Sequence, residues 1–149
     1  MSMRAAINSL LQHLLRSMCV ELAGKSGGGT LWLRDGSSQG FRLRAVVRNG
    51  RVLTPKDLRR ITVRGVHLLE NEIPGSGKPA CCPGYGMQRW LSNDLRGFIC
   101  FPINLDGRLL GRFVIWLKPS DASPTADQMR CAASLNELAR LTLRVLNKR

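Results

Sequence analysis

The chain has 149 residues, about the usual size of one domain, so we expect a single domain over 1–149. Hydrophobic residues make up 44% of it, which is enough for a buried core and excludes a disordered chain. Lysine and arginine number 23 against 10 acidic residues, which gives a net charge of +13. This charge predicts attraction for anionic partners, nucleic acid included, although a merely solvated basic surface accounts for it as well.

The cysteines bear on the cellular compartment. There are five, and most lie within apolar runs: Cys19, Cys81, Cys82, Cys100 and Cys131. An odd number in such positions does not favour a secreted disulfide framework. No cleavable leader pattern opens the chain, and no apolar run approaches the roughly 20 residues that span a bilayer. We therefore expect a soluble cytoplasmic protein with no membrane partner.

The N-terminal part predicts a helix followed by two strands. Apolar residues spaced three and four apart predict a helix over 3–22, ended by the glycines at 27–29. Strands are expected at 30–34 and 41–48. The second has alternating side chains: one face holds Phe41, Leu43, Ala45 and Val47, and the other holds Arg42, Arg44, Val46 and Arg48. That arginine face is either solvated or an anion-binding row.

The segment 54–94 predicts several short elements after an Asn49-Gly50 turn. Thr54 and Pro55 suit the start of a helix of one or two turns through Arg59. The elements expected next are a β-type run at 61–63, a short helix at 66–71, an extended segment at 78–83 and a helical turn at 87–93.

The strongest local prediction is a β-hairpin over 95–118. Asp106-Gly107 suits a type I′ turn, in which both central residues have positive φ. Both arms are almost continuously apolar, so we expect central strands that are covered on both faces. Arg112 is the one charge inside the second arm, and we expect it to face solvent or an acidic partner.

A last helix is predicted from about 124 to 147. It begins either with Ser123 as the N-cap and Pro124 at the first helical position, or with a capping box of Thr125 and Gln128. The stripe expected to face the core consists of Met129, Ala132, Leu135, Leu138, Thr142 and Val145.

No motif establishes an enzyme, and we assign no catalytic residue and no metal site. Gly75-Ser76-Gly77-Lys78 lacks the flanking residues of a phosphate-binding loop, and Pro79 blocks the helix that would follow. Cys81 and Cys82 should point to opposite faces of an extended segment. They are either one core and one surface cysteine, or they include a reactive thiol. Zinc-ligand spacing and nucleic-acid-binding motifs are absent from the sequence.

The order of elements and four short motifs resemble a GAF domain. The motifs are Phe101-Pro102-Ile103, Asp106-Gly107-Arg108, 110–114 and 124–127, and upstream Gly77-Lys78-Pro79 resembles the family's Gly-x-Pro strand. The resemblance implies an α+β fold, with a central antiparallel sheet and the N- and C-terminal helices on one face (GAF/PAS-like). It also implies a ligand pocket on the other face, roofed here by residues 54–94.

By the same resemblance, the protein would be a non-catalytic sensory or regulatory domain that binds a small signal molecule or a partner protein. The first and last helices would pair in a homodimer. The residues expected at the ligand are Arg44, Cys82, Tyr85, Trp90 and Phe101. A planar anionic ligand would suit stacking on Trp90 and an arginine clamp. The sequence names neither the ligand nor a cofactor.

Two alternatives come from other classes of protein. The first is a basic nucleic-acid- or nucleotide-binding protein whose anion patch is Arg42, Arg44, Arg48 and Arg51. The second is a thiol enzyme that resembles free methionine-R-sulfoxide reductase, because residues 77–81 are similar to its Gly-Lys-x-Ala-Cys segment. That enzyme has further cysteines, and none lies between Pro83 and Ile99. Tetrapyrrole attachment at Cys81, Cys82 or His67 is a variant of the ligand-binding reading.

Overall fold

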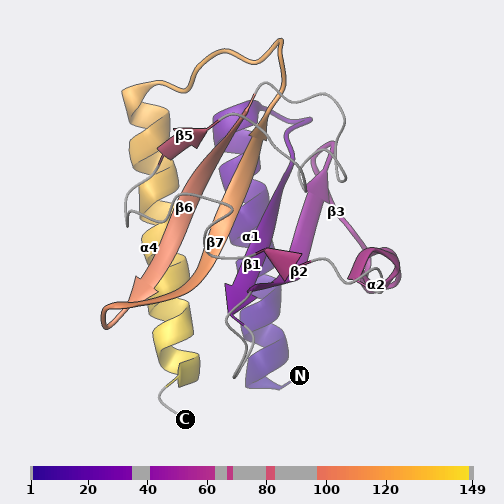
Figure 1. Cartoon of the computed structure of the whole chain (residues 1–149), viewed down its shortest axis with the longest axis vertical. Coiled ribbons are helices and arrows are strands. Elements are labelled where there is room, and N and C mark those ends of the chain that lie inside the picture. The colour runs from indigo at the N-terminus through magenta and orange to yellow at the C-terminus, as the bar shows by residue number, and fades with distance from the viewer. Residues whose placement is uncertain (1, 35–40, 63–66, 69–79, 83–96, 148–149) are drawn as a thin grey trace.

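The computed structural model describes residues 2–34, 41–62, 67–68, 80–82 and 97–147. The helices are α1 (Met3–Ala23), α2 (Pro55–Thr62) and α4 (Ala126–Asn147). The strands are β1 (Gly29–Arg34), β2 (Phe41–Arg48), β3 (Arg51–Val52), β4 (His67–Leu68), β5 (Ala80–Cys82), β6 (Gly97–Leu105) and β7 (Arg108–Leu117). Figure 1 shows α1 and α4 side by side behind the sheet, with both ends of the chain at the same end of the molecule.

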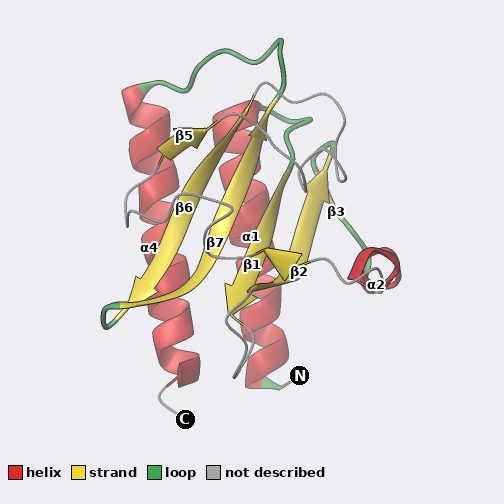
Figure 2. Ribbon diagram, in the orientation of Figure 1, coloured by secondary structure: helices red, strands yellow, loops and turns green. Residues whose placement is uncertain are grey.

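The strands form one sheet in the order β3-β2-β1-β7-β6-β5, and every pair is antiparallel. β4 also pairs with β2, on the edge that β3 occupies further along the strand. The two long helices cover a single face of this sheet (Figure 2). They run in opposite directions, and Gln128 near the start of α4 donates to the Glu21 carbonyl at the end of α1, at 3.0 Å. The predicted α+β fold, with both helices on one face, is confirmed.

The two turn predictions are also confirmed. Asp106 and Gly107 have φ values of 52° and 78°, and Leu105 pairs with Arg108 on either side of them. Asn49 and Gly50, at 51° and 75°, form the same kind of turn between β2 and β3. Positive φ at both central residues matches the right-handed twist of the flanking strands, so these dipeptides fix the hairpin registers.

The helix starts follow their capping residues. Ser2 caps α1, because its side chain accepts a hydrogen bond from the Ala5 amide at 3.1 Å. Thr54 caps α2 in the same way through the Asp57 amide. At α4 the Thr125 amide donates to Gln128 Oε1 and the Gln128 amide donates to Thr125 Oγ1. The capping box is therefore the correct start of α4, and the start at Ser123 is wrong.

Three local predictions are wrong. Residues 61 and 62 continue helix α2 rather than forming a β-type run, and 67–68 form strand β4 rather than a helix. On α4 the buried residues are Ala132, Ala139 and Leu143, while Leu138 and Val145 are 50% and 54% exposed. The buried stripe includes Ala139 because a helix turns every 3.6 residues, whereas hydrophobicity alone favours the larger Leu138 next to it.

Each face of the sheet carries its own hydrophobic cluster. On the helix face, which α1 and α4 cover, the cluster includes Leu15, Met18, Phe101, Phe113 and Ile115. The opposite face has a smaller and more aromatic cluster, made of Trp32, Phe41, Leu43, Val46, Phe98, Cys100, Val114 and Trp116. Leu58 of α2 packs against this second cluster, so the described start of the 54–94 segment lies on the opposite face. The central strands are thus covered on both sides, as the sequence predicts.

Candidate functional site

Arg112 lies in the middle of β7, on the opposite face of the sheet. Its cross-strand neighbours are Trp32 on β1 and Pro102 on β6, and Trp32 belongs to the opposite-face cluster. The side chain is only 1% exposed, so the expectation that it faces solvent is wrong. Its guanidinium carbon lies 5.5 Å from the centre of the Phe41 ring. A buried cation therefore stands within an aromatic surface, where cation–π attraction offsets part of its desolvation.

A second arginine shares the same aromatic ring. The guanidinium carbon of Arg34 lies 4.8 Å from the centre of the Phe41 ring, and its Nε donates to the Leu109 carbonyl at 2.9 Å. Nearby, the Trp32 indole N–H donates to Thr30 Oγ1 at 2.7 Å, in a buried contact. The opposite face thus combines flat aromatic rings with two positive charges. That combination is suited to a planar or anionic group.

Strand β2 contains a β-bulge where it pairs with β1. Leu31 pairs with Ala45 and the next residue, Trp32, pairs with Leu43, so Arg44 is an extra residue with no counterpart on β1. Phe41 and Leu43 consequently belong to the opposite-face cluster, together with Val46. Ala45 and Val47 belong to the helix-face cluster. The prediction of one unbroken alternation along β2 is therefore wrong, because a bulge places two successive residues on one side.

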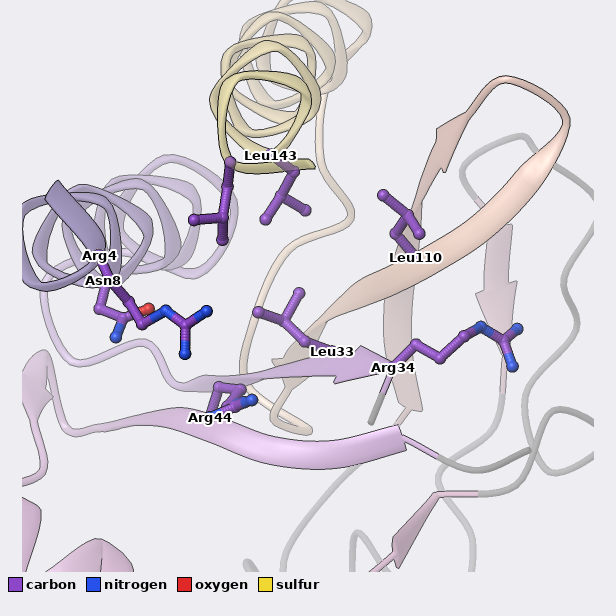
Figure 3. Close-up of a pocket in the computed structure, with 8 residues that line it drawn as sticks. Arg4, Asn8, Leu33, Arg34, Arg44, Leu110 and Leu143 are labelled. Atoms are coloured by element: carbon purple, nitrogen blue, oxygen red, sulfur yellow. The ribbon is translucent and has the colours of Figure 1, made fainter. Parts of the chain in front are cut away.

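Arg44 borders a cleft at the edge of the helix face, between the sheet and the ends of the two helices. The cleft has a volume of about 190 Å³. It is lined by Arg4, Asn8, Leu33, Arg34, Arg44, Leu110, Leu143 and Leu146. Figure 3 shows Leu33, Leu110 and Leu143 around the space, Arg4 and Asn8 to one side, and Arg34 pointing away to the other. We call this space the helix-face cleft.

Comparison with solved structures identifies the architecture. The GAF domain/HD domain protein from Geobacter sulfurreducens aligns over 95% of this chain and 94% of its own, with a TM-score of 0.66 and 14% identity. The chain has the GAF fold. The PixJ GAF domain of Thermosynechococcus elongatus, in its blue-light absorbing form, aligns over 99% of this chain and 90% of its own, at TM-score 0.63 and 13% identity.

The GAF domain of a phosphoenolpyruvate-protein phosphotransferase from Coxiella burnetii is also similar. It covers 98% of this chain and 95% of its own, with 18% identity and a TM-score of 0.61. No family model matches the sequence, and a search of curated proteins finds no relative. At these identities the likeness shows the fold of this chain and leaves its ligand and partners open.

The five residues expected at the ligand divide between the two faces and the undescribed segment. Phe101 is fully buried in the helix-face cluster, and its neighbour Cys100 is in the opposite-face cluster. Arg44 lines the helix-face cleft. Phe101 and Arg44 therefore lie on the helix face, away from α2. Strand alternation directs Phe101 there and the bulge directs Arg44. Cys82 pairs in register with Phe98, while Tyr85 and Trp90 lie outside the described residues.

The four arginines of the predicted anion patch do not form one row. Arg44 is the extra residue of the bulge, and Arg42 lies two residues before it. Arg48 lies at the far end of β2, where it pairs with Arg51 across the turn. Along a strand, residues six apart are separated by about 20 Å. A single anion would therefore not contact all four. Sequence reasoning also missed Arg4 and the leucines of α4, since only the fold brings the two ends of the chain together.

The described cysteines differ in their surroundings. Cys19 is buried in the helix-face cluster, and burial raises the pKa of its thiol to about 12. Cys100 is buried and Cys131 is exposed. Cys81 and Cys82 lie on strand β5, as predicted, and pair with Ile99 and Phe98 of β6.

Among the described ranges, no group of three His, Cys, Asp or Glu residues could hold a metal ion. In those ranges no helix is long and apolar enough to cross a bilayer.

Proposed function

We propose that this GAF domain is a sensory or regulatory domain that binds a small anionic molecule on the opposite face of its sheet. The observation that carries the proposal is the burial of Arg112 in a central strand, beside the Phe41 ring. A buried guanidinium costs free energy that a well-packed apolar side chain would not. The positive charge would attract an anion, and the aromatic surface beside it would hold a planar group.

A sensory role is also supported by the similar structures, since one of them is the blue-light absorbing form of a PixJ GAF domain. The ligand of this chain would occupy the space between the opposite face and the 54–94 segment. Cys82, Tyr85 and Trp90 remain candidate contacts there. The bound ligand would shift the equilibrium between two conformations of the domain. Such a shift requires that the ligand bind one conformation more tightly than the other.

The experiment is a thermal-shift screen against nucleotides, cyclic dinucleotides and haem. A ligand at a hundredfold its Kd adds about 2.7 kcal/mol to the free energy of unfolding, which corresponds to a rise of several degrees in Tm. Arg112→Met should remove the shift and keep the fold, because methionine fills a similar apolar volume. Arg44→Gln, on the helix face, is the control and should keep the shift. A screen without any shift, or a shift that Arg112→Met retains, contradicts the proposal.

DNA binding measured at increasing salt, alongside that screen, separates this function from nucleic-acid binding. Direct phosphate contacts predict an affinity for duplex DNA that falls with salt, at a log–log slope of about −0.9 per contact. Binding of that kind, without any small-molecule shift, would favour the nucleic-acid alternative. A small ligand that still binds at high salt, with no DNA binding, favours the sensory domain. The thiol-enzyme alternative predicts a reductase activity that Cys81→Ser or Cys82→Ser abolishes. A reductase activity that both variants retain would contradict it.

We further propose that the domain is a homodimer that pairs through its first and last helices. Three apolar side chains on the outer side of α4 support this: Leu138, Leu141 and Val145 are 50%, 42% and 54% exposed. Their spacing of three and four residues makes one stripe, and Met3 and Leu10 on α1 are also exposed. Leu141→Glu should convert a dimer to a monomer in sedimentation, whereas Lys56→Glu, at an exposed position on α2, should not. A monomeric wild-type protein at high concentration contradicts it.

A further inference from the structure

The helix-face cleft is separate from the opposite face and plays no part in the function proposed above. It is lined on one side by polar and cationic groups from Arg4, Asn8 and Arg44. The other side is apolar and consists of Leu33, Leu110 and the α4 leucines, of which Leu143 is 5% exposed. Arg34 also borders the cleft, but its guanidinium is engaged with the Phe41 ring and the Leu109 carbonyl. The cleft is thus amphipathic, with charge at one side and hydrocarbon at the other (Figure 3).

The bulge gives Arg44 its place in the cleft. Between Phe41 and Val47, Arg44 is the one residue that has no counterpart on β1, so the strand pairing would be regular without it. Bulges that direct a side chain toward a site are common beside binding and active sites. The Ala45 side chain that follows is buried in the helix-face cluster. The added residue therefore supplies a charge at the rim of the cleft while the core beside it is preserved.

The helix dipole does not favour a cation at the position of Arg4. Arg4 lies in the first turn of α1, which contains no acidic residue. The positive end of the helix dipole makes a cation unfavourable there and an anion favourable. Within the described part of the chain, the salt bridges join Arg130 to Asp127 and Arg140 to Glu137, and neither includes Arg4 or Arg44. Two exposed guanidinium groups and a helix N-terminus thus border one cleft. None of the residues that line this cleft is an aspartate or a glutamate.

We propose that the helix-face cleft binds a small anionic amphiphile, a carboxylate with a short alkyl chain. The carboxylate would accept hydrogen bonds from Arg4 and Arg44, whose guanidinium groups match its geometry, and from the Asn8 amide. The alkyl chain would lie against the leucines. A volume of about 190 Å³ is below the range of about 300–1,000 Å³ that is typical of drug-sized ligands, so the chain is short.

The test uses octanoate as the probe, with affinity measured by isothermal titration calorimetry. Arg4→Gln and Arg44→Gln should each weaken octanoate binding tenfold or more. Arg51→Gln removes the same charge from an exposed site beyond the far end of β2 and should change the affinity less than twofold. Because all three side chains are exposed, the variants should fold like the wild type. Leu146→Ala should weaken octanoate as well, since it removes part of the apolar wall.

Related compounds and a second variant define the result that would overturn the proposal. Acetate lacks the alkyl chain and octylamine reverses the charge, so neither should bind in the concentration range of octanoate. Arg112→Met should retain octanoate binding, because Arg112 lies on the other face. The proposal is overturned if octanoate does not bind, if Arg44→Gln binds it unchanged, or if acetate or phosphate binds equally well. Binding only to phosphatidylglycerol vesicles, without binding to free octanoate, also overturns it.

Discussion

The two faces of the sheet use the same residue type in opposite ways. On the helix face, Arg4 and Arg44 stand at the exposed rim of a cleft beside a large aliphatic core. On the opposite face, Arg112 is buried within a small aromatic cluster. An exposed guanidinium keeps its hydration and can bind an anion at little cost, whereas a buried one has already lost most of its water. The helix face therefore contributes most of the aliphatic core, and the opposite face holds a buried charge that lowers stability unless its partners compensate for it.

The largest expected effect tests whether Phe101 stabilises the helix-face cluster. Phe101→Ala should lower the free energy of unfolding by about 3–5 kcal/mol, because it removes a fully buried ring from the helix-face cluster. Urea denaturation at constant pH measures this, and the change should appear in the midpoint rather than in the m-value. A near-wild-type midpoint together with lost ligand binding would instead place Phe101 at a ligand, as the sequence first indicates.

Most of the fold could be predicted from local residues. The Asp106-Gly107 and Asn49-Gly50 pairs fix two hairpins, and the Thr125–Gln128 capping box fixes the start of the last helix. These predictions succeed because the physical cause lies within four residues of sequence. Segments 61–62 and 67–68 were mispredicted because short apolar runs suit either a helix or a strand, and tertiary pairing decides between them.

A smaller effect is expected from the polar contact inside the opposite face. Thr30→Val removes the oxygen that accepts the Trp32 indole N–H and leaves that buried donor unsatisfied. The cost should be about 1–3 kcal/mol in the free energy of unfolding. Thr30→Ser keeps the hydroxyl and is the matched control, with most of the stability retained. A Thr30→Val protein as stable as the wild type would show that this hydrogen bond does not contribute to the free energy of unfolding.

Deleting Arg44 is expected to cost less again. The deletion brings Leu43 next to Ala45, which matches the pairing of Trp32 and Leu31 and converts the bulge into regular ladder. The cost in stability should be about 1 kcal/mol, near the average for single changes, while octanoate binding is lost. Circular dichroism during thermal unfolding measures the first effect and calorimetry the second. Severe unfolding of the deletion variant would show that the bulge is needed for strand pairing rather than for the cleft.

The candidate sites were far less predictable than the fold. A bulge leaves no mark in the period-two pattern of 41–48, so that pattern predicts Ala45 and Val47 on the same face as Phe41 and Leu43. The helix-face cleft joins residues from both ends of the chain, and no local pattern connects them. Arg112 was the exception, since a single charge inside an apolar strand already marks an unusual environment.

The effect that is smallest near neutral pH concerns cysteine ionisation on the helix face. Burial raises the pKa of the Cys19 thiol from 9.0 to about 12, so the folded protein keeps this group neutral where an unfolded chain would ionise it. A thiol reagent at pH 8 should therefore label exposed Cys131 and leave Cys19 unmodified until the protein unfolds. Mass spectrometry of peptides from the labelled protein identifies the site. Rapid labelling of Cys19 under native conditions would mean that α1 opens readily from the sheet.

The same pKa shift gives a stability prediction with a definite sign. Because the folded pKa lies above the unfolded one, the native state binds more protons in this range, and the stability from burying Cys19 is complete below about pH 9. It is lost as the pH rises toward 12, by at most about 1.36 kcal/mol per unit. Lysine and tyrosine titrate there too, so the free energy of unfolding is compared with that of Cys19→Ala across pH 8–11. Parallel curves for the two proteins would show that Cys19 ionises equally in both states, and that the helix face is more accessible to water than its packing implies.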